Sequence, residues 1–112
     1  MSEKRIKKIN DLLRDEVALI FLDEFDFGDE TLVTVVNAEV SKTLEHANIK
    51  ISVFPVGEAK PILDRINKNI FNVQQRLNRR LVMRKVPKIR FEIDKTEEHA
   101  SHIENILGDL KK

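Results

Sequence analysis

Residues 65–91 read RINKNIFNVQQRLNRRLVMRKVPKIRF and combine two periodicities. Apolar residues first recur at steps of three and four, which places them in one stripe along a helix of about 3.6 residues per turn. Pro87 cannot continue a helix, and beyond it polar and apolar residues alternate as in a strand with one buried face. The stretch therefore predicts a helical region at 59–84 and a strand at 88–94. The stripe consists of Ile62, Ile66, Ile70, Val73, Leu77 and Leu81.

The same stretch is strongly basic. It holds nine Lys or Arg residues and no acid, so it carries +9; since the whole chain carries +1, the other residues together carry −8. A block of one sign attracts polyanions. We interpret it as an anion-binding surface with nucleic acid as the first partner to test, the alternative being a solvated helix face. The nine cations, of which the first five flank the stripe and should face solvent, are Arg65, Lys68, Arg76, Arg79, Arg80, Arg84, Lys85, Lys88 and Arg90.

Length and composition indicate one soluble domain, 1–112. A chain of 112 residues with 41% hydrophobic residues can bury a core. Cysteine is absent, which excludes disulfides, thiol catalysis and cysteine zinc sites. No apolar run approaches the roughly 20 residues of a membrane-spanning helix, and no signal-peptide core follows Met1. We therefore expect a cytoplasmic protein without membrane contact.

The N-terminal region predicts a first helix over about 3–23, with Ser2 as its N-cap. Cations cluster at its start, where they oppose the helix dipole. A phosphate partner would explain them, and a solvated lysine-rich terminus is the alternative. These cations are Lys4, Arg5, Lys7 and Lys8, and the expected apolar face is Ile6, Ile9, Leu12, Leu13, Val17 and Ile20.

The middle of the chain predicts two strands, at 32–41 and 49–55, after a turn at 26–29. The link of about seven residues is too short for a parallel crossover, so they should be antiparallel. The long helical region that follows permits a crossover, so the third strand should lie parallel to the second with a right-handed connection. The inward residues should be Leu32, Val36, Ala38 and Val40 on the first strand and Ile49, Ile51 and Val53 on the second.

Two further features concern charge and helix continuity. Residues 23–45 carry seven acids against Lys42 alone, and we expect this acidic end to point away from a polyanion. The helical region 59–84 is one helix or two. A kink is expected near three closely spaced asparagines, because asparagine is a poor helix former. They are Asn67, Asn69 and Asn72.

A last helix should begin at the cap Thr96, with an apolar face made of Ile103, Ile106, Leu107 and Leu110. The order of elements is then α-β-β-α-α-β-α. This predicts an α+β domain with a three-stranded mixed sheet and helices packed on one face.

Catalytic chemistry is thinly represented. His99 and His102 could share a metal with Glu98, but two histidines on an exposed helix are ordinary surface residues, and His46 has no partner nearby. Glu92 and Asp94 fit a charge-balancing role better than a hydrolytic one. The serines lack a nucleophile motif, and the three isolated glycines build no phosphate loop. We expect no catalytic residue, no metal, no cofactor and no enzyme activity.

Three strings, in this order and spacing, make nearly the whole chain resemble the ribosome-binding factor A family. Arg5-Ile6 opens the first helix. VSKTLEHA at 40–47 precedes a strand at 48–54, and LVMRKVPKIRFEID at 81–94 ends in the family's Pro-x-Leu-x-Phe-x-x-Asp pattern, with Ile89 at the Leu position. The resemblance implies a type II KH-like fold, in agreement with the order above. This chain departs from the family at the kink between the central helices, where Asn69-Ile70-Phe71 replaces Ala-x-Gly, and at Thr43, which replaces an Asp.

The resemblance implies an assembly factor that binds the small ribosomal subunit and its rRNA, with ribosomal proteins as further candidate partners, and that acts as a monomer. It should assist late maturation and 5′-end processing of that rRNA, chiefly in the cold. We expect phosphate contacts without base stacking, because Tyr and Trp are absent. The alternatives are a KH-like RNA-binding protein acting off the ribosome and a module whose basic helix docks an acidic protein. The expected RNA-binding residues are the nine cations of 65–91 with Lys4, Arg5 and Lys8.

Overall fold

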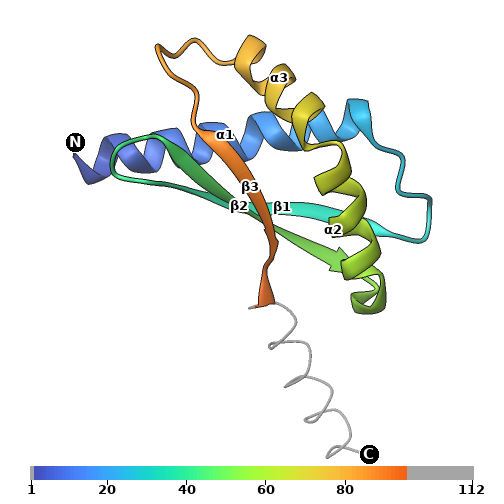
Figure 1. The fold of residues 1–112 in the computed structure, drawn as a ribbon. Helices are drawn as coiled ribbons and strands as arrows, with labels where there is room; N and C mark the ends of the chain where they lie inside the picture. The colour runs from blue at the N-terminus through green and yellow to red at the C-terminus, as the bar shows by residue number, and fades with distance from the viewer. Residues whose placement is uncertain (1, 96–112) are drawn as a thin grey trace, which may run out of the picture.

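The computed structural model of the chain describes residues 2–95. Six of the seven expected elements lie within this range, and their order is confirmed (Figure 1). The last helix, expected from Thr96, lies outside the described residues. The elements are α1 (Glu3–Glu24), β1 (Leu32–Val40), β2 (His46–Phe54), a short 3₁₀ helix η1 (Val56–Glu58), α2 (Ala59–Lys68), α3 (Ile70–Arg80) and β3 (Lys88–Ile93).

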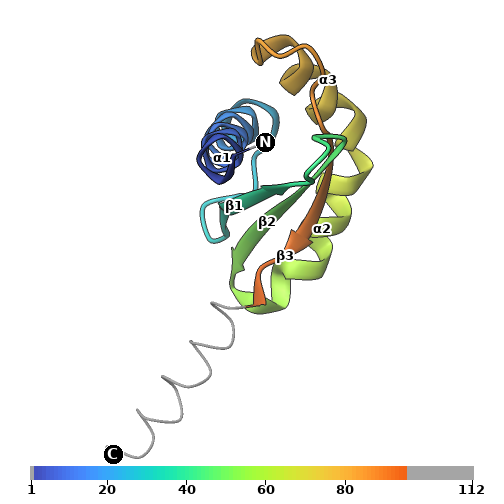
Figure 2. The same cartoon turned by 90° about the vertical axis from the view of Figure 1, so that its left-hand side faces the viewer.

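The three strands form one mixed sheet in the order β1-β2-β3. β1 and β2 are antiparallel, while β2 and β3 are parallel, as expected. Every second side chain of β2, from Ala47 to Val53, is buried in the same cluster as residues of all three helices. Within the described residues, the helices therefore cover one face of the sheet, and no helix covers the other (Figure 2). The α+β class with helices on one face is confirmed.

The apolar stripe of the central region forms one wall of the core. Ile66, Val73 and Leu77 have no exposed surface, and Ile62 and Leu81 are also buried. Burying such side chains contributes roughly 1.5–3 kcal/mol each. From α1 the core receives Leu13, Val17, Ile20 and Phe21, whereas Leu12, expected on that face, is 43% exposed. Leu12 lies one position away from the buried stripe, on the solvent side of the helix.

The helical region is interrupted at Asn69, as expected. Asn69 has backbone angles outside the helical range (φ −108°, ψ 12°) and separates α2 from α3. Its side-chain amide donates a hydrogen bond to the carbonyl of Arg65 (2.9 Å) and so satisfies a carbonyl in the last turn of α2. An asparagine side chain that competes for the backbone interrupts a helix without glycine. This is how the chain makes the kink with Asn69-Ile70-Phe71.

β1 contains a bulge that overturns part of the expected inward face. Val35 pairs with Ile51 and Asn37 with Lys50, which leaves Val36 as the extra residue. An extra residue reverses the alternation of side chains along a strand. Before the bulge Val33 and Val35 therefore pack against the core, while Leu32 is 65% exposed and Val36 takes no part in that packing. After the bulge the expected Ala38 and Val40 point inward.

The β1–β2 turn is tighter than expected because Ser41 closes it. Its hydroxyl accepts hydrogen bonds from the amides of Glu45 (3.1 Å) and His46 (3.2 Å). Its own amide donates to the carbonyl of His46 (2.8 Å). β2 therefore begins at His46 rather than at Ile49.

α3 ends at Arg80, four residues before the expected boundary. Leu81 turns into an extended conformation (φ −92°, ψ 130°) and buries its side chain in the core. Residues 81–87 then form an irregular connection to β3, ending in the buried Pro87. Arg84 and Lys85 consequently lie on this connection and not on a helix.

Candidate nucleic-acid interface

Four segments meet at one end of the sheet: the start of α1, the β1–β2 turn, the α3–β3 connection and the start of β3 (Figure 1). Two hydrogen bonds hold them together. The amide of Val40 donates to the side-chain oxygen of Asn10 on α1 (2.9 Å), and the amide of Lys88 donates to the carbonyl of Glu45 (2.9 Å). The fold thus brings both ends of the sequence-predicted basic set to one place.

We call this region the basic end. It contains seven of the twelve cations expected to bind RNA, and none of the seven forms an ion pair with any residue of the described range 2–95. Lys7 and Lys42 lie at the same end. Because no carboxylate neutralises these side chains, they are available to an external anion. The seven are Lys4, Arg5 and Lys8 on α1, Arg84 and Lys85 on the connection, and Lys88 and Arg90 on β3.

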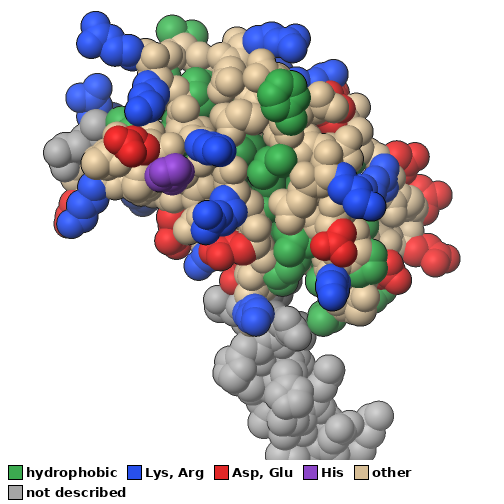
Figure 3. Space-filling model, viewed as in Figure 1, with side chains coloured by type: hydrophobic (Ala, Val, Ile, Leu, Met, Phe, Trp, Pro, Cys, Tyr) green, Lys and Arg blue, Asp and Glu red, His purple; other side chains and the backbone are tan. Residues whose placement is uncertain are grey.

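A hollow of about 380 Å³ lies on the open sheet face at the basic end. The strand register places His46 beside Lys88 and Asn48 beside Arg90, and these four side chains line the hollow with Ile89. Figure 3 shows Lys and Arg side chains around the histidine on this surface. His46, which had no partner in sequence, therefore joins the candidate site, and so does Asn48. Their alternate positions in a strand could have indicated a shared face.

Gln74 on α3 fixes the position of β3. Its side-chain oxygen accepts a hydrogen bond from the amide of Ile89 (2.9 Å), and its amide nitrogen donates to the carbonyl of Pro87 (3.1 Å). One side chain thus satisfies two backbone groups on the outer edge of β3, which has no further strand beside it in the sheet that the structure describes. It holds the strand carrying Lys88 and Arg90 against the helices.

Three cations of the basic block are engaged within the fold. Arg76 pairs with Asp23 (3.7 Å) and with Glu24, and Arg80 pairs with Glu16. All three carboxylates belong to α1. These two arginines therefore join α3 to α1, although their side chains remain 44% and 41% exposed.

Arg65 is the third, and it is engaged differently. It donates a hydrogen bond to the carbonyl of Asp26 (2.7 Å), and its guanidinium lies over the rings of Phe25 (5.7 Å) and Phe27 (5.3 Å). Within residues 2–95 only Lys68 and Arg79, among the block's helical cations, have no such partner. The cations of the block therefore differ in their surroundings, because three of them have partners within the fold.

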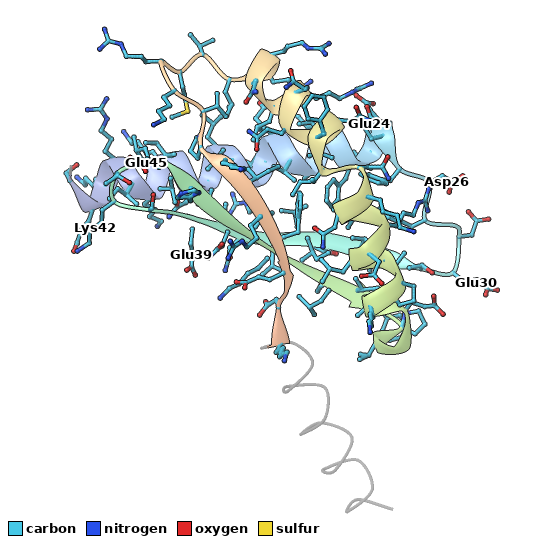
Figure 4. The ribbon with its side chains drawn as sticks, in the orientation of Figure 1. Glu24, Asp26, Glu30, Glu39, Lys42 and Glu45 are labelled. Carbon is cyan, nitrogen blue, oxygen red and sulfur yellow. The ribbon has the colours of Figure 1, made fainter. Side chains whose placement is uncertain are left out.

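The acids of 23–45 divide between the two ends of the molecule. Figure 4 shows Glu24, Asp26 and Glu30 together at the end opposite to Lys42 and Glu45. The hairpin register explains this division, because Leu32 lies opposite Phe54 and Val40 lies opposite Ala47, at the two ends of β1. The acids of 23–30 thus lie opposite the basic end, but the expectation of a single acidic end is wrong for Glu45, which lies at the basic end. Glu39 pairs with Lys50 (3.6 Å).

The described residues hold no group of three or more side chains suited to a metal ion. His99, His102 and Glu98, the weak metal candidate, lie outside the described range. Within residues 2–95, no helix is long and apolar enough to cross a membrane.

Comparisons with known proteins agree on one family. The family model for ribosome-binding factor A matches residues 5–107. The chain is 31% identical over 111 residues to ribosome-binding factor A of Akkermansia muciniphila, covering 97% of this chain and 86% of that protein. It is 29% identical over 114 residues to the Clostridium novyi protein of the same name, covering all of this chain and 94% of the relative.

Solved structures agree on the fold. The crystal structure of ribosome-binding factor A from Thermus thermophilus superposes with a TM-score of 0.71 at 20% identity, covering 81% of this chain and 97% of that one. A homology model of the Thermus thermophilus protein, fitted into a cryo-EM map of a 30S–RbfA complex, gives a TM-score of 0.61 at 21% identity. The match covers 76% of this chain and 90% of that one. The core architecture is thus shared where most of the sequence differs.

Proposed function

Because the chain belongs to the ribosome-binding factor A family, we propose that it binds the small ribosomal subunit and assists its late maturation, including 5′-end processing of its rRNA. The family match over 5–107 carries this proposal. It is supported by the relative whose coordinates were fitted into a 30S complex. A protein with this role acts in the cytoplasm, as a monomer, by binding and not by catalysis, and it matters most in the cold, when RNA rearranges slowly.

We assign the rRNA contact to the basic end. Its cations come from three separate segments and lack carboxylate partners within 2–95, and two of them, Lys88 and Arg90, line a hollow together with His46 and Asn48. Lys and Arg side chains bind phosphate oxygens and position a protein on RNA, while the shape of the RNA supplies selectivity. If four to six phosphates are contacted, log affinity should fall with log salt at a slope of roughly −3 to −5.

The test is co-sedimentation with purified small subunits. The variant Lys88→Glu/Arg90→Glu reverses two outward-facing charges of β3 and should travel with the subunits far less than the wild type. The matched control Lys60→Glu/Lys95→Glu reverses two exposed charges outside the basic end and should bind like the wild type.

Three results would contradict the proposal in different ways. Wild-type protein that ignores small subunits but binds free RNA would favour an RNA-binding protein acting off the ribosome. Wild-type protein that binds neither would favour a module for an acidic protein partner. If the Lys88→Glu/Arg90→Glu variant still binds subunits, the function stands and the assigned interface is wrong.

A further inference from the structure

Phe71 is an exposed aromatic residue that the fold does not use. It is the second residue of α3, directly after the break at Asn69, and its side chain is 71% exposed. The core takes its neighbours Ile70 and Val73 instead. A phenylalanine left in water forgoes the stabilisation that its burial would supply. Sequence reasoning excluded a stacking surface from the absence of Tyr and Trp and so overlooked this ring.

The surroundings of Phe71 are polar. It lines a surface hollow of about 540 Å³ with Glu24, Asn72, Gln75, Arg76 and Arg79. Figure 3 shows a hydrophobic side chain reaching the surface over α3, with charged side chains beside it.

One arginine of this hollow has no carboxylate partner in the described range. Arg76 already pairs with Glu24 and Asp23, so it is not available to a ligand, and these three groups carry a net charge of −1. Arg79 forms no ion pair with any residue of 2–95, so it leaves one free positive charge in the hollow.

These side chains match the chemistry of an unpaired nucleotide. An aromatic ring stacks on any nucleobase, because every base has a π face. The amides of Asn72 and Gln75 each offer hydrogen-bond donors and an acceptor for a base edge. The guanidinium of Arg79 suits a phosphate. A hydrophobic contact for another protein would not need two amides and a free arginine around one ring.

We propose that Phe71, Asn72, Gln75 and Arg79 bind one unpaired nucleotide, with its base stacked on Phe71 and its phosphate on Arg79. The inference rests on the proposed function and adds to it a contact with single-stranded RNA, on the helical layer of the fold and not on the open sheet face. The basic end then holds the backbone of the RNA, while this hollow selects for an unstacked base.

The test uses the full chain and a short single-stranded RNA carrying the fluorescent base 2-aminopurine, whose emission falls when it stacks. The wild type should quench the emission, and Phe71→Leu should abolish the quenching and weaken binding by about 5- to 150-fold. Leucine keeps an apolar side chain and a helical backbone, so this variant folds. Phe71→Trp should keep or strengthen both signals.

Two controls separate this proposal from its premise. Phe54→Leu alters another exposed ring (69%), on the open sheet face, and should leave quenching unchanged. Binding of duplex RNA, which offers no unpaired base, should not respond to Phe71→Leu. If the wild type travels with small subunits while Phe71→Leu binds and quenches like the wild type, only the nucleotide site is overturned. If the wild type does not travel with subunits, the proposed function is overturned, and with it the premise of the nucleotide site.

Discussion

The α1–α3 contact and the basic end use the same residue types for different purposes. Both draw on one continuous basic block, yet Arg76 and Arg80 meet carboxylates of α1 while Lys88 and Arg90 meet none in the described range. The first pair therefore contributes to the fold, and the second remains available for a partner. A block of charge in a sequence becomes a surface only where packing brings no opposite charge to it.

The reason lies in the charge pattern of α1. Its first two turns carry Lys4, Arg5, Lys7 and Lys8, whereas acids dominate from Asp11 to Glu24. α3 packs against the acidic part through Arg76 and Arg80. The basic start of α1 instead lies beside the hairpin turn, through Asn10 and Val40. The acidic part of α1 thus neutralises arginines of α3, while the first turns of α1 contribute cations to the basic end.

The largest effect should come from removing the cations of the α3–β3 connection and β3. Changing Arg84, Lys85, Lys88 and Arg90 to alanine should reduce the steepness of the salt dependence of rRNA binding by about 3, because each of the four lost phosphate contacts removes roughly 0.7–0.9 of a unit. The free energy of unfolding should change little, since exposed side chains without partners contribute little to it. Titrations over a series of salt concentrations, with thermal melts alongside, check both. An unchanged slope would place the interface elsewhere.

Gln74 connects α3 to the start of β3 at the basic end, and its replacement should have the second largest effect. Gln74→Leu leaves the amide of Ile89 and the carbonyl of Pro87 without their partner, which should lower the free energy of unfolding by about 1–3 kcal/mol. Urea denaturation measures this. The matched control is Gln75→Leu, whose side chain makes no hydrogen bond within residues 2–95 and which should cost much less. Equal losses for the two variants would show that Gln74 does not anchor β3.

A variant of Arg65 tests whether a cation of the block can stabilise the fold without forming an ion pair. Arg65→Met keeps the aliphatic contact but loses the hydrogen bond to Asp26 and the position over Phe25 and Phe27, so stability should fall by about 1 kcal/mol. Lys68→Met, three residues further along α2, should be close to neutral. Thermal melts of the two variants measure this difference. If Arg65→Met also weakens RNA binding under conditions where the variant is folded, Arg65 belongs to the RNA interface.

The pair Arg80–Glu16 should show the smallest effect. A partly exposed pair contributes about 0.2–1 kcal/mol. Arg80→Gln and Glu16→Gln should each destabilise by that amount, and the double variant should lose no more than one of them. High salt should reduce the coupling, while the salt slope of rRNA binding should stay that of the wild type. A coupling energy near zero would mean that Arg80 is free after all.

Local periodicity was enough to predict most of the fold. The spacing of the stripe in α2 and α3 corresponds to the turn of a helix, and alternation in β2 corresponds to the pleat of a strand, so both could be read without neighbours. The bulge at Val36 could not, because an extra residue is defined only by the partner strand it faces. Leu12 was likewise assigned to the inward face from its spacing along the helix, whereas its exposure depends on where β1 and α3 lie.

The candidate site was less predictable than the core. Sequence reasoning named the cations of the basic end, but it could not separate them from Arg65, Arg76 and Arg80. It also passed over His46 and Asn48, which gain meaning only beside Lys88 and Arg90 in the parallel register. Phe71 was overlooked because aromatic content was counted and exposure was not known.

Sequence alone was sufficient for the types and order of the elements within residues 2–95, the buried stripe, the break at Asn69 and the family, because each depends on residues close together in the chain. Tertiary structure decided which cations are neutralised, which ones gather at the basic end, and that Phe71 is left in solvent. Those outcomes depend on distances between side chains far apart in sequence, such as the 64 positions that separate Arg80 from Glu16. Coulomb attraction falls with distance and screening, so the charge of a surface is settled only when the chain has folded.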